Sequence, residues 1–184
     1  MTAKEFIKSL ANGKSDIIQI LLDILEETHS KYCLIGGLAV NAYVEPVVSL
    51  DVDIVVAVRD IESVIRAAKT HELKVEQFEH SINISGHGSD LRIQVQTNPR
   101  YQTFIAGAEV RSILGYETRV AALEDVLQGK VWAYTDQTCR RSKRQKDLAD
   151  ILRLMETFPG LADKLPQSSR EQLTEGWDKS ANGI

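Results

Sequence analysis

Two aspartates separated by one residue are the first feature of this sequence that could do chemistry. Asp51 and Asp53 begin the apolar run DVDIVVAV, which is typical of a buried strand. Alternate residues of a strand point to the same face, so their Cα atoms would lie roughly 6.5 Å apart on one side. Neighbouring carboxylates repel each other unless a cation lies between them, and Mg²⁺ prefers oxygen ligands. The pair indicates a site for Mg²⁺ or Mn²⁺, against the alternative of an exposed strand end.

A pair of glycines precedes the aspartates by thirteen residues. Gly36 and Gly37 follow the short apolar run YCLI, which predicts a strand that ends in a turn. Glycine lets the backbone approach a ligand closely, and N–H groups at the start of a following helix can bind phosphate oxygens. A glycine pair is also common in turns that bind nothing. Together with the aspartates, it favours a site for a nucleoside triphosphate and its metal.

The elements that must position these residues form a mixed sheet with helices. Periodicity predicts helices at 16–29, 38–44, 61–71, 99–106, 123–134 and 143–158. It predicts strands at 32–35, 51–58, 74–78, 81–85, 91–97, 109–114 and 117–121. We therefore expect an α+β fold. Residues 1–122 would form the mixed-sheet core with an N-terminal helix, and residues 123–184 a helical portion packed on it, with a polar tail.

A lysine on the apolar stripe of a predicted helix is a further candidate. Lys130 lies three residues after Leu127 and four before Tyr134, so it shares their face. A lysine there must either extend to solvent along its aliphatic stem or meet an anion. Both interpretations stay open, the anion being a phosphate or a carboxylate of the site.

The next predicted helix begins with a dense basic cluster that includes Arg144 and Lys146. Cations at a helix N-terminus are disfavoured by the helix dipole, so a nearby anion would offset their cost. That anion could be the triphosphate, an RNA acceptor or the two aspartates. The alternative is a solvated helix start, in which lysines pair with Asp147 and Asp150 four residues further on.

The spacing GG-x13-DVD, with Ser49 two residues before Asp51, resembles the signature of the DNA polymerase β-type nucleotidyltransferase superfamily. Within it, the chain is most similar to small bacterial proteins grouped with AbiEii-type abortive-infection toxins. The segment VAALEDVLQGKVWA resembles the part of that group where a strand leads into a lysine-bearing helix, and RSKRQKDLADILRL resembles its closing helix. The resemblance covers about residues 32–158.

This resemblance implies a nucleotidyltransferase-type mixed sheet and transfer of a nucleoside monophosphate from a triphosphate to an acceptor hydroxyl or phosphate. Asp51 and Asp53 would hold two Mg²⁺ ions with the nucleotide bound, and Lys130 would neutralise phosphate charge or assist the acceptor. Gly36 and Gly37 would line the triphosphate. Beside what the resemblance implies, we expect Ser49 and, from the basic cluster, Arg144 and Lys146 to contribute to nucleotide binding. A toxin of this type would modify RNA, often tRNA, or protein, and would be restrained by an antitoxin-like partner.

The third carboxylate that the superfamily usually supplies is missing from the expected position. In the predicted strand 91–97, that position falls at Gln94, whose amide carries no charge and is a poor general base. Asp90 points to the same face, about 13 Å further along the strand. We therefore keep a second hypothesis: a nucleotide-binding or regulatory module that retained the fold and lost the chemistry.

Composition is that of an ordinary globular protein. The net charge of −4 argues against a surface coated in basic residues for duplex binding. The two cysteines, Cys33 and Cys139, form no metal or redox motif, which favours free thiols in a reducing cytoplasm. No apolar run reaches the ~18 residues of a membrane span, so we expect no membrane partner.

Overall fold

In a computed structural model of the protein, residue 5 and residues 15–173 are described. The chain divides into two compact units, Met1–Ala122 and Leu123–Ile184. The polar tail that we expect at the C-terminal end falls mostly beyond residue 173, outside the described residues. No helix in the described part of the chain is long and apolar enough to cross a membrane.

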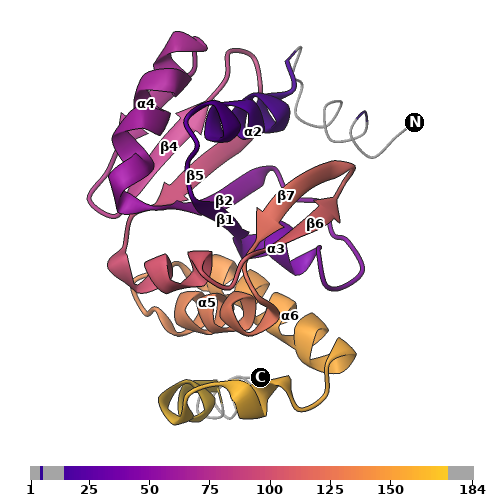
Figure 1. Cartoon of the computed structure of the whole chain (residues 1–184). Coiled ribbons are helices and arrows are strands. Elements are labelled where there is room, and N and C mark those ends of the chain that lie inside the picture. Colours follow the sequence, from indigo (N-terminus) through magenta and orange to yellow (C-terminus); the bar gives the residue numbers. More distant parts are fainter. Residues whose placement is uncertain (1–4, 6–14, 174–184) are drawn as a thin grey trace. The chain divides into compact units, whose positions relative to one another are not determined.

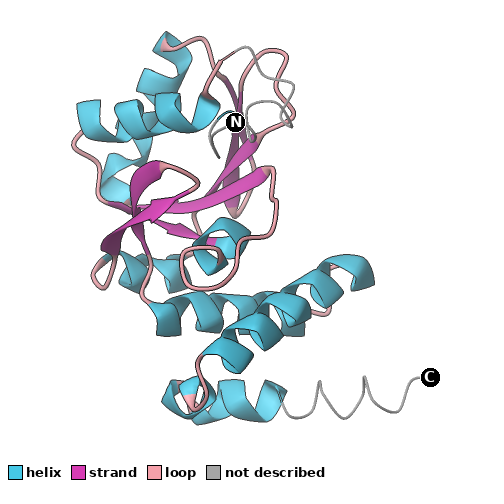
Figure 2. Ribbon diagram, turned by 90° about the vertical axis from the view of Figure 1, so that its right-hand side faces the viewer, coloured by secondary structure: helices cyan, strands magenta, loops and turns pink. Residues whose placement is uncertain are grey.

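The described residues of the first unit contain a seven-stranded mixed sheet with the order β3-β4-β5-β2-β1-β7-β6. Two strand pairs, β1 with β7 and β2 with β5, are parallel, and the remaining pairs are antiparallel. Figure 2 shows these strands in one twisted layer. The strands are β1 (Tyr32–Ile35), β2 (Asp51–Val56), β3 (Lys74–Gln77), β4 (Ser81–Ser85), β5 (Arg92–Gln96), β6 (Glu109–Ile113) and β7 (Tyr116–Val120).

Two helices of the first unit, α2 (Ile17–Glu27) and α4 (Ile61–Thr70), lie on one face of this sheet (Figure 1). Asp16 begins α2, because its carboxylate accepts a hydrogen bond from the Gln19 backbone N–H. The strand residues on the α2 side are apolar, and Val52 and Ile54 of β2 are almost fully buried there. Because side chains alternate along a strand, Asp51 and Asp53 lie on the opposite face.

The short helix predicted at 38–44 is α3 (Gly36–Val40), which begins on the glycine pair itself. The first unit also differs from the sequence prediction in two details beyond the ends of strands. Strand β2 ends at Val56, because residues Val58–Asp60 form a 3-10 turn, η1, in which Val58 is exposed. The predicted helix at 99–106 is a 3-10 helix, η2 (Pro99–Ile105), capped by Asn98. Neither change alters the position of the aspartates, since both occur beyond the far end of their strands.

The second unit is helical in its described residues. It contains α5 (Leu123–Thr135), α6 (Arg141–Thr157) and the 3-10 turn η3 (Leu161–Lys164). Helices α5 and α6 pack against each other. The acidic residues Glu124 and Asp125 occupy the first turn of α5, where the helix dipole favours them. The buried side of α6 carries two carboxylates, Asp147 and Asp150, beside the apolar Ile151 and Leu154.

Candidate nucleotide and metal site

The two aspartates open strand β2 on its polar face. Asp51 and Asp53 alternate with the buried Val52 and Ile54, so the two carboxylates share one side of the sheet. Both aspartates are only half-buried, and the Asp51 side chain is 50% exposed. The carboxylates can therefore meet a ligand from solvent, which a fully buried pair could not do.

The glycine turn lies against Asp53. Gly36 opens the short helix α3 (Gly36–Val40) with a φ of +71°, a conformation that glycine adopts without strain. A Cβ atom at this position would lie 2.8 Å from the Asp53 Cβ, closer than real side-chain contacts allow. Strand pairing places Ile35 directly opposite Asp53, which brings the start of the turn to the carboxylate. Position 36 is therefore restricted to glycine by the carboxylate itself as well as by its φ.

Gly37 and Ser49 complete this side of the site. A Cβ atom on Gly37 would make an ordinary contact of 3.6 Å with the Ser49 Oγ. The Ser49 hydroxyl donates to the Asp51 carbonyl oxygen at 3.2 Å and accepts from the Asp51 N–H at 3.4 Å. The serine thus fixes the backbone that leads into β2 and holds its hydroxyl near the glycine turn.

Strand β5 brings Gln94 beside the aspartates. The parallel register pairs Asp53 with Gln94 and Asp51 with Arg92, and paired residues of neighbouring strands share a face. The next strand, β4, places Asn83 opposite Gln94. The position next to Asp53 thus holds a neutral amide, as the sequence pattern predicts. Asp90 is exposed and precedes the start of β5, so this register does not pair it with either aspartate.

Arg92 is a site residue that our sequence reasoning did not select. Its Nη2 atom lies 3.3 Å from the Asp51 Oδ1, and the two side chains are 70% and 50% exposed. The signal was present in the sequence, because Arg92 is two residues before Gln94 and alternates onto the same face. The sequence pattern does not give the register between β2 and β5, and this register determines that Arg92 lies beside Asp51.

Lys130 lies in the second unit, buried on α5 among carboxylates. Its Nζ atom donates to the Asp147 Oδ1 at 2.9 Å and contacts the Asp150 Oδ2 at 2.7 Å. Arg153 pairs with the other oxygen of Asp150 at 2.8 Å. Burial alone lowers the pKa of Lys130, but attraction to the two carboxylates outweighs burial and raises that pKa above its ordinary value. Lys130 is therefore held in its charged form.

Lys130 does not extend to solvent, since it is buried and pairs with Asp147 and Asp150, two carboxylates that the sequence interpretation did not name. Contact of Lys130 with a phosphate or with the carboxylates of the site stays a prediction. The interpretation in which Asp147 and Asp150 pair with lysines of α6 at i,i+4 spacing is wrong, because both carboxylates form ion pairs with Lys130. The second carboxylate oxygen of Asp147 is buried without a hydrogen-bond partner among the described residues. Sequence reasoning missed this cluster because it combines residues that are 17 and 20 positions from Lys130.

The two basic candidates of α6 have different surroundings. The Arg144 Nε donates to the Tyr134 carbonyl oxygen at 2.8 Å, and its Nη1 donates to the Gln137 side chain at 3.1 Å. Arg144 therefore helps to fix the connection between α5 and α6. Lys146 is exposed. An encounter of these residues, or of Lys130, with the aspartates of the first unit stays a prediction.

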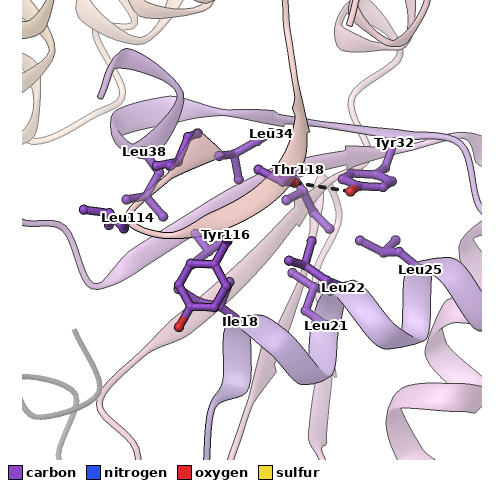
Figure 3. Close-up of a pocket in the computed structure, with 13 residues that line it drawn as sticks. Ile18, Leu21, Leu22, Leu25, Tyr32, Leu34, Leu38, Leu114, Tyr116 and Thr118 are labelled. Carbon is purple, nitrogen blue, oxygen red and sulfur yellow. Dashed lines mark hydrogen bonds between the residues drawn. The ribbon is translucent and has the colours of Figure 1, made fainter. Parts of the chain in front are cut away.

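An apolar pocket also lies in the first unit, on the α2 face of the sheet (Figure 3). It is bordered by leucines of α2 and by aromatic rings of β1 and β7, with a hydrogen bond of 3.2 Å between the Tyr32 and Thr118 hydroxyls. The Tyr116 hydroxyl donates to the Asp16 carboxylate. Apart from its two tyrosines the pocket lining contains no ionisable group, so it offers no carboxylate to a metal and no cationic side chain to a phosphate.

No protein-family model and no curated protein matches this sequence. Solved structures do match. The antibiotic-resistance factor ANT(2'')-Ia gives a TM-score of 0.62 at 12% identity, with 90% of this chain and 93% of that chain covered. A nucleotidyltransferase-like protein from Paracoccidioides brasiliensis gives 0.60 at 18% identity, covering 97% and 90%. The lincosamide antibiotic adenylyltransferase LnuA, with lincomycin bound, gives 0.55 at 13% identity, covering 78% and 99%. The chain has the nucleotidyltransferase fold.

The nucleotidyltransferase fold confirms the α+β class and the mixed sheet flanked by helices that the sequence predicts. Membership of the nucleotidyltransferase superfamily, which the resemblance implies, stays a prediction. The narrower resemblance to AbiEii-type toxins stays a prediction. At these identities the likeness concerns the fold, so the chemistry must be argued from the residues of this chain.

The residues at this point of the nucleotidyltransferase fold fit a divalent metal. The donor set is two carboxylates on one strand face, and hard cations such as Mg²⁺ and Mn²⁺ prefer such oxygens. A cation, the Arg92 guanidinium, already lies against Asp51. Among the described residues no group of three or more acidic, histidine or cysteine side chains could hold a metal by itself. The remaining ligands would have to come from water and substrate phosphates.

Proposed function

We propose that the protein is a metal-dependent nucleotidyltransferase, which transfers a nucleoside monophosphate from a nucleoside triphosphate to an acceptor. The observation that carries this proposal is the turn at Gly36, which lies against Asp53 on the sheet face that also bears Asp51. A glycine turn can bind phosphates and two carboxylates can bind the metal, so the two binding sites are adjacent here. The nucleotidyltransferase fold of the chain supports the same conclusion.

The glycine turn would bind the triphosphate. The first N–H groups of a helix have no partner within that helix, and those of Gly36 and Gly37 open α3. Phosphate oxygens can approach these N–H groups because neither residue has a side chain. Ser49, whose hydroxyl lies near Gly37, would add a further polar contact.

Asp51 and Asp53 would hold Mg²⁺ or Mn²⁺, which supplies charge neutralisation and polarisation of the phosphate oxygens when bound. In the reaction, the acceptor hydroxyl oxygen attacks the α-phosphorus and forms a new P–O bond. The bond between the α-phosphorus and the bridging oxygen to the β-phosphate breaks, and pyrophosphate leaves with that electron pair. The hydroxyl proton passes to water, because Gln94 beside Asp53 is a poor base.

We further propose the narrower assignments that the resemblance implies. Lys130, Arg144 and Lys146 are candidates for contacts with phosphate or acceptor. An RNA acceptor, a toxin role restrained by a partner protein and action in the bacterial cytoplasm belong to the same proposal. Two structural neighbours are named with an antibiotic compound bound, ANT(2'')-Ia with adenylyl-2''-tobramycin and LnuA with lincomycin. A small-molecule acceptor therefore has to be tested beside RNA.

A second candidate function is favoured by one observation. Gln94 pairs in register with Asp53, at the position where a third carboxylate would act as metal ligand or base. A protein with this replacement can bind a nucleotide without transferring it. This candidate is a nucleotide-binding or regulatory module with the same site and no turnover.

The two candidates are distinguished by transfer of label. The protein is incubated with each α-labelled nucleoside triphosphate and Mg²⁺, with total RNA, tobramycin, lincomycin or no acceptor. A nucleotidyltransferase transfers label to one acceptor and releases pyrophosphate. A binding module retains the nucleotide and transfers nothing.

The site itself is tested by binding linkage. Saturating Mn²⁺ with ATP should raise the melting temperature. At a ligand concentration 100 times the dissociation constant, the free energy of unfolding should increase by about 2.7 kcal/mol. Asp53→Ala should abolish this rise. Asp23→Ala, which removes an exposed carboxylate from α2, is the matched control and should respond like the wild type. A rise that persists in Asp53→Ala would show that the metal site is elsewhere.

A further inference from the structure

An arginine occupies the place next to the proposed metal site. Arg92 of β5 is paired in register with Asp51 of β2, and its guanidinium lies 3.3 Å from the Asp51 Oδ1. The register of the sheet, rather than the reach of a long side chain, sets this neighbour. On its other side, Arg92 pairs in register with Ser85, which offers no charge. Asp51 is therefore the carboxylate toward which the sheet directs Arg92.

The neighbouring cation on the same face behaves differently. Lys74 follows Ser85 in the cross-strand row and forms an ion pair at 2.9 Å with Glu76 of its own strand. Its charge is thus neutralised within β3. Arg92 is instead neutralised by a residue of the proposed site, so the two cations of this row have different partners.

Arg92 and a divalent metal compete for Asp51. A metal bound by that carboxylate would lie within a few ångströms of the guanidinium, and like charges at such a distance repel each other appreciably even near the surface. The ion pair itself is weak, because both side chains are largely exposed. Arg92 can therefore leave Asp51 as soon as a better anion is available.

Nucleotide phosphates are such an anion. A guanidinium binds two phosphate oxygens at once, and these charge-assisted pairs are stronger than a single exposed contact with a carboxylate. A triphosphate at the glycine turn would place its oxygens beside Asp53, which is paired with Gln94, two residues along β5 from Arg92. Two residues of a strand span about 6.6 Å, which is within the reach of an arginine side chain.

We propose that Arg92 is a gating residue, an inference that rests on the proposed function. In the free protein it holds Asp51 and weakens metal binding. When the triphosphate arrives, the guanidinium moves to the phosphates and Asp51 becomes available to the metal. Metal and nucleotide then bind cooperatively, each raising the affinity of the other by the same factor.

The test measures binding rather than turnover, with Arg92→Gln as the main variant. Arg59→Gln is the matched control, because Arg59 is equally exposed (70%) and pairs with Asp60 after the far end of β2. Mn²⁺ binding without nucleotide is followed by electron paramagnetic resonance, and ATP binding in EDTA by calorimetry. Arg92→Gln should bind Mn²⁺ alone about tenfold more tightly and ATP alone about tenfold more weakly. Cooperativity between metal and nucleotide should decrease to the part that comes from direct ligation of the metal by phosphates.

Arg92→Lys keeps the charge but loses the bidentate geometry. It should bind Mn²⁺ like the wild type and ATP more weakly, which separates the electrostatic part of the proposal from the geometric part. Both Arg92 variants should melt within about 2 °C of the wild type, since an exposed pair contributes little to stability. This keeps the binding measurements interpretable as effects on folded protein.

The outcomes separate this inference from the proposed function. If wild-type protein binds neither Mn²⁺ nor Mn²⁺–ATP, the proposed function fails. If the wild type binds both and Arg92→Gln behaves like Arg59→Gln, gating is refuted while the function stands. If Arg92→Gln gains Mn²⁺ affinity but keeps its ATP affinity, Arg92 only shields Asp51, and its transfer to phosphate is refuted.

Discussion

Replacing Gly36 by alanine should damage both the fold and the site, because two separate constraints meet at this residue. The φ of +71° is one, and contact with Asp53 is the other. Two further glycines of the same unit separate these constraints. Gly88 has a φ of +69° and nothing within 4 Å of an added Cβ, whereas Gly37 has no positive φ and only an ordinary contact.

The expected magnitudes follow from these differences. A positive φ costs a non-glycine residue about 1–2 kcal/mol, which is the whole effect expected for Gly88→Ala. In Gly36→Ala the new methyl group would also lie 2.8 Å from the Cβ and 2.9 Å from the Cγ of Asp53. The Asp53 Cβ is bonded to the backbone of β2 and does not move when the side chain rotates, so about 1–3 kcal/mol of overpacking is added. Gly37→Ala should be neutral or stabilising by up to about 1 kcal/mol, since glycine is a poor helix residue.

The assay is thermal unfolding of the three variants with and without Mn²⁺–ATP. At about 2–4 °C per kcal/mol for a protein of this size, Gly36→Ala should melt about 10 °C below the wild type, and Gly88→Ala about 4 °C below it. Mn²⁺–ATP should raise the melting temperature of Gly88→Ala as it does for the wild type. It should raise that of Gly37→Ala less, because the added methyl group hinders the approach of phosphate oxygens to the turn. Gly36→Ala should lose that rise, because its methyl group displaces the Asp53 carboxylate.

The comparison between Gly36→Ala and Gly88→Ala is the decisive one. Equal stability of these two variants would mean that the methyl group at position 36 meets no obstacle, so that the turn does not lie against Asp53. The geometric basis of the proposed site would then be wrong, even if the protein bound nucleotides.

Two further predictions concern the second unit and the third-carboxylate position. Lys130→Met should lower the free energy of unfolding, measured in urea, by about 3–5 kcal/mol, because it leaves two buried carboxylates without their shared cation. The control Lys164→Met, which removes an exposed ion pair, should cost about 0–1 kcal/mol. Because the pKa of Lys130 is raised in the folded state, its contribution to the free energy of unfolding is complete below its ordinary pKa near 10.4. That contribution is lost as pH rises through the higher folded-state pKa. A wild-type protein whose stability does not fall in this pH range would contradict the prediction. Gln94→Asp should tighten Mn²⁺ binding and, if only this acid is missing, raise the rate of nucleotide transfer on the order of 10²-fold. Fast nucleotide transfer by the wild type would refute the hypothesis that the site has lost its chemistry.

The sequence alone was sufficient for the strands that carry the site, because their signals are local. Alternation in DVDIVV and the apolar run YCLI determine which residues face the core, and the structure places β1 and β2 at those positions. The end of β1 at the glycine pair has the same local character. These elements required no knowledge of long-range contacts.

Arg92 and the Lys130 cluster could not be obtained in the same way, because they depend on register between distant segments. The pairing of Asp51 with Arg92 joins residues 41 positions apart, and nothing in either strand specifies the offset between them. Similarly, Lys130 is attracted to whichever carboxylates α6 presents, and helix periodicity gives the face but not the rotation of one helix against another. The predicted pairing of those aspartates with α6 lysines failed for this reason.

The charge of the polar sheet face connects the missing acid with the unexpected arginine. With Gln94 neutral, this part of the face carries two carboxylates and one guanidinium, so a divalent ion meets a net charge of only about −1 at neutral pH. Such a face should bind a bare metal weakly, and the phosphates of a nucleotide should supply both the missing oxygens and a partner for Arg92. We therefore expect the metal to bind tightly only together with a nucleotide, whether or not nucleotide transfer follows. The enzyme and the binding module share this step, and they differ in whether the acceptor hydroxyl then loses its proton and attacks the α-phosphorus.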